Sequence, residues 1–438
     1  MKKIVVITII FAVIFTLKPD YVLSQGAFTP PLTLSDCYRL SLIQSEAIAI
    51  DADQIKIVEA HFLEALSIVI PHVSFISMDI QRAKKSGGSS VSTSGGILSS
   101  SATASQRQFN VTQTLFNGFK AIAAIKGSGY ERGQRTKEKI RAEQLLLVDV
   151  ANAFYLLLEE RDDLQALERI GMALDNRVKE LITRAKLGKS RPSEIVNAKA
   201  QFYSVVATVE QIQAREVVAR QLLEFLVGGP VGEIGDNYKF PAKLKPENYY
   251  VSRASTRPDV EATKFAWEVA KENIIVADSD FLPTVGVDAN YYTQRTGSNK
   301  GIDWDITLQV NVPIFEGTEV LGRSKEANLR ADQRRLTYRR TNRQAPYDIR
   351  VAYNDLTAAM EVRDTLRKAY KTARTNVHLQ VKDYDRRLVN NLDVLAGIQT
   401  LENTERNYIH AYYEAKRQYW QLRVAVGQSG TESLDDTF

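Results

Sequence analysis

The sequence has little of what sites of catalysis or metal binding need. Its 438 residues include one cysteine, Cys37, and four histidines, His61, His72, His378 and His410, on unrelated segments. A single cysteine excludes an internal disulfide framework, and the histidines have no metal-ligand spacing. No glycine-rich phosphate loop or nucleophile elbow is present in the sequence. We therefore expect no catalytic residue, no metal, no cofactor and no enzymatic activity.

Excess charge of one sign and long apolar runs are also scarce. The chain has 57 Lys and Arg against 52 Asp and Glu, a near balance that gives no reason to expect a nucleic-acid partner. The N-terminal apolar run, Ile4 to Leu17, follows two lysines and is too short to span a membrane comfortably. With the small residue Ser24 after it, this pattern is typical of a cleaved secretory signal, so we expect residues 1–24 to be removed. A retained signal anchor is the alternative.

A pattern of short motifs occurs twice along the chain. Phe116-Asn117-Gly118 recurs as Phe315-Glu316-Gly317, and Val227-Gly228 recurs at the same spacing as Val426-Gly427. Ile70-Pro71 corresponds to Leu282-Pro283 at a slightly longer spacing, because the first copy carries a Ser- and Gly-rich stretch at residues 86–105. The sequence therefore predicts two structural repeats, with an external loop tolerant of insertion in the first.

Four segments alternate between apolar and polar residues, as strands with two different faces do. We expect these strands at about residues 72–83, 106–116, 283–294 and 304–315. The last is the most regular, and its apolar positions are Trp304, Ile306, Leu308, Val310, Val312 and Ile314. In the first, the apolar phase changes at Ile76, which a β-bulge would explain.

Strands of this length suit a tilted crossing of an outer membrane, with apolar side chains facing lipid. A soluble sandwich with its apolar faces turned inward is the alternative. Four strands cannot close a barrel, and an open sheet edge cannot sit in lipid, so several copies must share one barrel, and three copies give twelve strands. The sequence predicts a homotrimer in outer membrane lipid, and its predicted lipid-facing residues are Trp304, Ile306, Leu308, Val310 and Val312.

The remaining sequence is typical of unusually long helices. Residues 118–187 contain no proline, are rich in helix-forming residues and include a heptad seam of apolar residues. A turn and a return helix at 193–227 follow. The second copy repeats this plan with helices at 317–385 and 392–426, and we expect a kink at Pro346. There the seam becomes polar toward Gln380, Tyr384 and Arg387, as it would if it lined water, although an exposed helix end has the same pattern.

These segments give the predicted organisation of the chain. Repeat 1 covers residues 25–228, a non-helical inter-repeat segment in an equatorial position covers 229–257, and repeat 2 covers 258–427. The polar residues 428–438 are predicted to be disordered.

In this order, the duplicated elements resemble those of the TolC-like outer membrane efflux protein family, from about residue 32 to residue 427. The resemblance implies an all-α fold with a membrane β-barrel portion: a trimeric 12-stranded β-barrel in the outer membrane of a Gram-negative-type cell, continuing into a long α-helical, coiled-coil barrel in the periplasm. It implies an exit duct for a tripartite efflux pump or a type I secretion system. The implied partners are a periplasmic adaptor (membrane fusion) protein and an inner membrane pump. The alternative from another class is a periplasmic coiled-coil scaffold without a pore.

The resemblance also implies functional residues at the tips of the helical hairpins, where the family has its closed periplasmic entrance. The family pattern Asp-Val-Leu-Asp corresponds to Asp393-Val394-Leu395-Ala396, so the first carboxylate is kept and the second is replaced by alanine. The family has an arginine at the position that corresponds to Val389, and this arginine is missing here. The implied entrance residues are Asp393, Glu194, Tyr384 and Arg387, and the implied adaptor-contact residues are Leu187, Gly188, Ser190, Val389 and Asn390. For Asp393, an acid that only stabilises the helix N-terminus is the alternative.

Overall fold

The structure is a computed structural model that describes residues 31–81, 103–239, 244–296 and 300–428. The predicted signal segment 1–24, most of the predicted loop 86–105 and nearly all of the predicted tail 428–438 lie outside the described residues. The last three residues of that loop, 103–105, belong instead to a strand.

The elements follow one another in a similar order in the two halves of the chain. The first half has α1 (Leu34–Gln44), α2 (Glu46–Ser67), β1 (His72–Gln81), β2 (Thr103–Asn117), α3 (Lys120–Lys186) and α4 (Pro192–Val227). The second half has α5 (Glu247–Val251), the 3-10 turn η1 (Ala254–Thr256), α6 (Pro258–Asp278), η2 (Ser279–Phe281), β3 (Thr284–Arg295), β4 (Trp304–Asn311), α7 (Glu319–Asp385) and α8 (Asn391–Ala425). In both halves a helix leads into two strands, which are followed by a very long helix and a shorter one.

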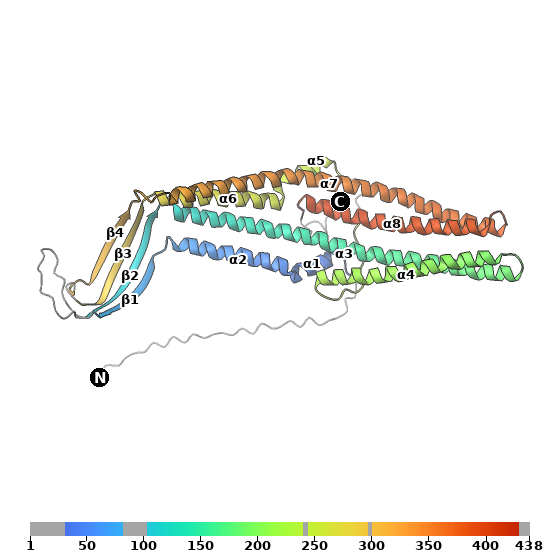
Figure 1. Cartoon of the computed structure of the whole chain (residues 1–438), viewed down its shortest axis with the longest axis horizontal. Helices are drawn as coiled ribbons and strands as arrows, with labels where there is room; N and C mark the ends of the chain where they lie inside the picture. The colour runs from blue at the N-terminus through green and yellow to red at the C-terminus, as the bar shows by residue number, and fades with distance from the viewer. Residues whose placement is uncertain (1–30, 82–102, 240–243, 297–299, 429–438) are drawn as a thin grey trace, which may run out of the picture.

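The four strands form one antiparallel sheet in the order β1-β2-β3-β4 (Figure 1). β4 ends at Asn311 rather than at residue 315, because Pro313 has no N–H to donate to a strand ladder. The bulge considered for the first strand is absent, since β1 pairs with β2 in one continuous register from His72 to Gln81. The register shifts lie between β2 and β3 instead. Ile76 therefore lies on the same face of the sheet as its partner Gln108.

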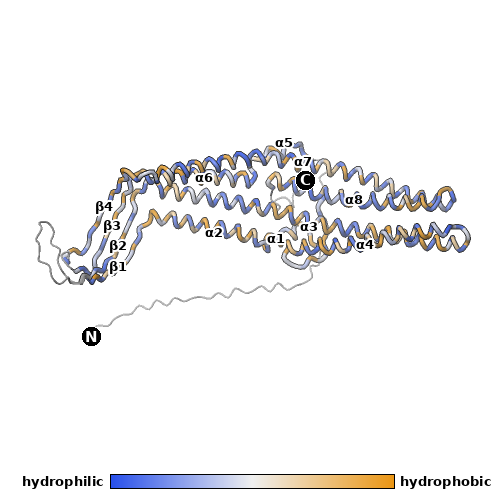
Figure 2. The backbone as a smooth tube through the Cα atoms, viewed as in Figure 1, coloured by the Kyte–Doolittle hydropathy of each residue, from blue (hydrophilic) through white to orange (hydrophobic). Residues whose placement is uncertain are grey.

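The helices form one long layer attached to the sheet. Next to the sheet lie α2, α3, α6 and α7, in the same order as the strands to which they connect. In the half away from the sheet, α3 pairs with α4 and α7 pairs with α8, so that this end consists of two helical hairpins (Figure 1). No described helix has the length and apolar character needed to cross a membrane, and Figure 2 shows polar and apolar residues mixed along each one.

Two clusters of buried side chains hold the helices together. The larger lies in the middle of the molecule and includes Phe154, Tyr155 and Trp420, all without solvent exposure. The smaller lies between the hairpins and includes Leu167, Leu174, Val178 and Leu181 of α3, which belong to the segment where the sequence predicts a heptad seam. Each fully buried leucine of this kind stabilises the fold by about 1.5–3 kcal/mol.

α7 is one continuous helix through Pro346. The helix packs tightly there, since the flanking residues Ala345 and Ile349 are fully buried. The buried Arg257, which precedes α6, bonds Asp348 of α7 at 3.0 Å. Figure 1 shows α7 changing direction beside α5, whose Glu247 accepts a bond from Arg350. Proline removes one helical hydrogen bond, and the surrounding contacts hold the helix together in spite of that loss.

Candidate functional site

One face of the sheet consists of exposed apolar side chains. On β4, Trp304, Ile306, Leu308 and Val310 are each 58–63% exposed, and Val312, just beyond the strand, is 56% exposed. The row continues across the sheet, because Trp304 is paired with Tyr291, Tyr291 with Phe109 and Phe109 with Phe75. The ring centroids of Phe109 and Phe75 lie 5.1 Å apart. A contiguous apolar face of this kind marks a surface for lipid or protein rather than for water.

The opposite face of the sheet carries a network of polar side chains. Asn290 lies at its centre and donates to Asp288 at 2.8 Å and to Asp305 at 2.9 Å. Its carbonyl oxygen accepts from Gln108 and Asn110, each at 2.9 Å. The network joins β2, β3 and β4. The sequence alternation predicted a polar face, but not these bonds, since each depends on the register between strands.

At the far end of the molecule, the first hairpin tip contains Leu187, Gly188, Ser190 and Glu194. Leu187 is 64% exposed, and Gly188 has a positive φ of 69° that glycine adopts without strain. The carboxylate of Glu194 accepts bonds from the Ser190 hydroxyl at 2.5 Å and from the Arg191 N–H at 3.4 Å. Glu194 therefore stabilises the start of α4 as an N-terminal acid.

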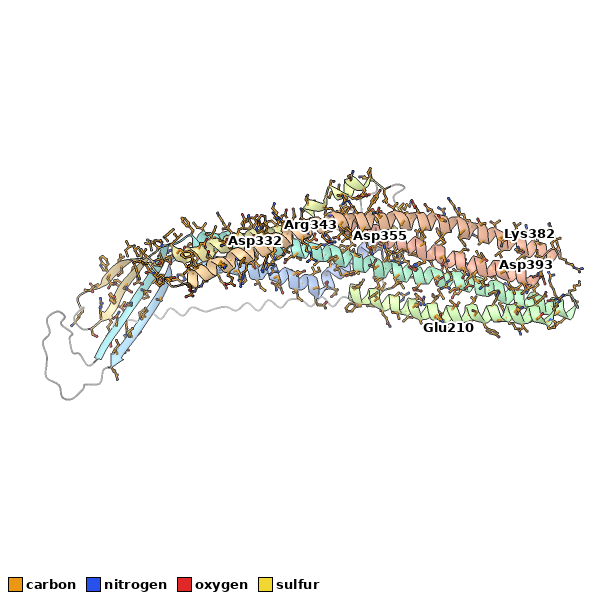
Figure 3. All side chains as sticks on the ribbon, turned by 45° about the horizontal axis from the view of Figure 1, so that its top comes forward. Glu210, Asp332, Arg343, Asp355, Lys382 and Asp393 are labelled. Carbon is orange, nitrogen blue, oxygen red and sulfur yellow. The ribbon has the colours of Figure 1, made fainter. Side chains whose placement is uncertain are left out.

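The second tip is closed by a reciprocal capping box. The Asn390 side chain accepts from the Leu392 and Asp393 N–H groups at 2.8 and 3.2 Å, and the Asp393 carboxylate accepts from the Asn390 N–H at 3.0 Å. α8 therefore begins at Asn391, one residue before the predicted start, because Asn390 is the cap. Val389 packs partly against the smaller buried cluster. Figure 3 shows Asp393 near this end of the molecule.

Tyr384 joins the two hairpins of one chain. Its ring lies 3.8 Å from the guanidinium of Arg177 and 4.7 Å from that of Arg184, both on α3. Arg177, only 5% exposed, also donates to Asn391 at 2.8 Å, and Arg184 bonds Asp385 at 2.5 Å. A cation–π contact contributes about 2 kcal/mol when the cation is desolvated, as Arg177 is, and less when it is partly exposed, as Arg184 is. The side chains form a link between α3 and the α7–α8 hairpin.

This link differs from the predicted entrance in two ways. Tyr384 is 8% exposed, so the interpretation of its seam as lining water is wrong at this residue. Its contacts are with Arg177 and Arg184, whereas Glu194 and Asp393 bond within their own tips. Arg177 was not predicted, because one arginine beside an apolar seam gives no signal that it meets a tyrosine of a distant helix.

Arg387 has a backbone conformation that suits glycine. Its φ is 63°, and it occupies the turn of the second hairpin as Gly188 does in the first. A non-glycine residue in this region costs about 1–2 kcal/mol. We therefore expect Arg387→Gly to raise the free energy of unfolding by about 1 kcal/mol, measured by thermal unfolding of the purified chain in detergent. Arg387→Val removes the same charge but should destabilise the tip. Equal effects of both substitutions would contradict the interpretation that the backbone of Arg387 is strained.

Comparison with known proteins agrees with this architecture. The family model described as Outer membrane efflux protein matches residues 250–428. Outer membrane protein TolC of Vibrio cholerae serotype O1 is 21% identical over 316 residues, which cover 69% of this chain and 72% of that protein. The alkaline protease secretion protein AprF of Pseudomonas aeruginosa is 24% identical over 334 residues, 73% of this chain and 68% of that protein.

Solved structures show the same fold over most of the chain. The outer membrane protein VceC from Vibrio cholerae superposes with a TM-score of 0.78 at 19% identity, covering 90% of this chain and 96% of VceC. The MtrE outer membrane channel of Neisseria gonorrhoeae superposes with a TM-score of 0.74 at 16% identity, covering 90% and 89%. The family model, the relatives and the solved structures agree with the resemblance predicted from the sequence: the chain is similar to the TolC-like outer membrane efflux proteins.

Proposed function

We propose that three copies of this chain form an exit duct in the outer membrane, serving a tripartite efflux pump or a type I secretion system. The outer membrane location is the one that the family description and the names of the relatives give. In the proposed trimer, the three sheets close into a 12-stranded barrel, and the helix layers close into an α-helical barrel that extends into the periplasm. The two halves of the chain would be structural repeats of one unit.

The sheet with two unlike faces carries this proposal. Its apolar face is exposed along β4, whereas its other face holds the network around Asn290. A lipid-facing exterior and a water-filled lumen require this arrangement. The predicted lipid-facing residues are each 56–63% exposed, as the proposal requires: Trp304, Ile306, Leu308, Val310 and Val312. A periplasmic scaffold without a pore would have no use for such a surface.

Fractionation and conductance test the proposal together. When cells are fractionated, the protein should separate with outer membranes. After purification it should run as a heat-resistant or cross-linkable trimer and give discrete conductance steps in a planar bilayer. A soluble periplasmic protein without conductance would support the scaffold instead.

The tips of the helical hairpins are the proposed entrance and adaptor surface. Leu187, Gly188, Ser190, Val389 and Asn390 lie in the two turns farthest from the sheet, where a periplasmic adaptor protein bound to an inner membrane pump would reach them. Asp393, Glu194, Tyr384 and Arg387 lie in or beside the same turns. Three copies of Asp393 around one axis would attract cations into the mouth of the duct.

Replacing Asp393 separates an entrance carboxylate from a capping acid. We expect Asp393→Asn to weaken the block of single-channel current by added cations, because the amide removes the charge but can still accept the Asn390 N–H bond. Asn390→Ala is the matched control: it removes the cap, at about 0.5–2 kcal/mol of stability, and keeps the carboxylate. If cation block is unchanged in Asp393→Asn, the residue is a capping acid and not part of the entrance.

A further inference from the structure

The four-helix layer next to the sheet has two open edges. Its order is α2, α3, α6 and α7, so α2 and α7 each have a helix on one side. β1 and β4, which connect to these helices, are likewise the edge strands of the sheet. One side of the molecule therefore ends in β1 and α2, and the other in β4 and α7 (Figure 1).

The two edge helices carry opposite charge. α2 contains five carboxylates and one lysine. Between residues 330 and 343, α7 contains six arginines and one carboxylate, Asp332. Among the described residues, Arg330 pairs with Glu326 and Arg335 with Asp332, which leaves four arginines of this stretch without a carboxylate partner. They are Arg334, Arg339, Arg340 and Arg343. Figure 3 shows Asp332 and Arg343 on this helix.

Each edge helix also exposes apolar side chains at a spacing of seven residues. On α2, Ile50 and Ile57 are 60% and 46% exposed, and on α7, Leu329 and Leu336 are 57% and 56% exposed. A seven-residue spacing keeps side chains on one face of a helix. The buried residues of α2, Ile48 and Val58, fall on a different side of the helix from Ile50 and Ile57.

The positions of these residues along the two helices correspond. Counted from the sheet end of each helix, Ser67 in α2 and Glu319 in α7, Ile57 lies as far along as Leu329, and Ile50 as far along as Leu336. Glu46 lies as far along as Arg340, and both are exposed. Helices of equal rise per residue that start at the same end keep such residues level with each other.

We propose that the α2 edge of one copy docks against the α7 edge of the next copy. Glu46 faces Arg340 across a seam formed by Ile50, Ile57, Leu329 and Leu336, so that opposite charge selects the contact. Because the two surfaces differ, the association is head to tail, and such contacts form a closed ring when the rotation from one copy to the next closes, as it does in the proposed trimer. The edges β1 and β4 meet in the same contact. This inference rests on the proposed trimeric duct and adds which surfaces join and what makes the contact specific.

Charge reversal in the full-length protein tests the seam. We expect Glu46→Arg or Arg340→Glu alone to lower the yield of trimer at low salt by about fivefold. The double variant, with both reversals in one chain, should restore the yield, because the pair is then reversed at every interface. Arg334→Glu is the matched control: it makes the same charge change on α7 but away from the seam, and should leave the yield unchanged.

A cysteine pair gives a second measurement that does not depend on charge. Ile50→Cys combined with Leu336→Cys should form disulfides between neighbouring copies, seen as a covalent trimer without reducing agent, while the native Cys37 is fully buried. A stable trimer that shows neither the disulfide nor any response to charge reversal would contradict the proposed seam, but it would not contradict the proposed trimeric duct. Absence of a trimer in the unmodified protein would overturn both.

Discussion

Replacement of Lys416 by alanine should lower the free energy of unfolding by about 3–5 kcal/mol, because it leaves a carboxylate in the protein interior without its partner. Lys416 is 1% exposed, and its ammonium group lies 2.7 Å from the carboxylate of Asp236 and 2.5 Å from the Tyr238 carbonyl oxygen. The side chain of Asp236 is itself only 14% exposed.

The surroundings of Lys416 explain this expected cost. Burial lowers the pKa of the lysine, and Asp236 counteracts that shift. The rings of Tyr238, Tyr412 and Tyr155 lie 5.2–5.8 Å from the ammonium group, where their faces attract a cation. The pair also has a structural role, because it fastens the segment before residue 240 to α8, and Ile234 of that segment bridges Leu32.

Two comparisons separate the buried pair from a general effect of losing a lysine. Lys179→Ala removes a lysine that is 69% exposed and paired with Asp175 at 2.6 Å, and should cost less than about 1 kcal/mol. The double variant with Lys416→Met and Asp236→Asn should lose less free energy of unfolding than Lys416→Ala, since no charge is left buried. Denaturant unfolding in detergent at one protein concentration measures all three. Similar losses for Lys416→Ala and Lys179→Ala would contradict the argument.

The sequence predicted features whose physical basis is local. The alternation from Trp304 onward indicated a strand with two faces, because successive side chains of a strand point to opposite sides. It did not indicate that the strand ends at Asn311, although Pro313 was visible. The strand was predicted to continue past Pro313 because the apolar residues Val312 and Ile314 keep the same alternation after the strand has ended.

Features that depend on contacts between distant residues could not be predicted. The polar seam near Tyr384 suggested a water-lined surface, whereas Arg177 and Arg184 of another helix cover the ring. Lys416 gave no signal either, since a lysine in a long helix is usually exposed, and its partner Asp236 lies far away in the sequence. The phase change at Ile76 suggested a bulge in β1, but only the pairing with β2 shows that the register is continuous.

Replacement of Leu308 by arginine should prevent normal assembly in the outer membrane. Leu308 is 63% exposed on the apolar face of the sheet, near the middle of β4, and is paired with Val287 of β3. An arginine that faces lipid near the membrane midplane costs about 2–4 kcal/mol, and a trimer would carry three such residues. We expect little folded trimer in outer membrane fractions of Leu308→Arg, and a similar loss in Val310→Arg.

Gln309→Arg is the matched control, because it places the same side chain on the neighbouring residue but on the opposite face of the sheet. Gln309 is paired with Gly286, which has no side chain to obstruct the longer arginine, and a water-filled lumen tolerates its charge. If the apolar face meets lipid, Gln309→Arg should assemble normally while Leu308→Arg does not. Normal yields of trimer from both Leu308→Arg and Val310→Arg would refute the lipid-facing assignment. Equal damage from Gln309→Arg would refute a water-filled lumen, because both faces of the sheet would then exclude charge.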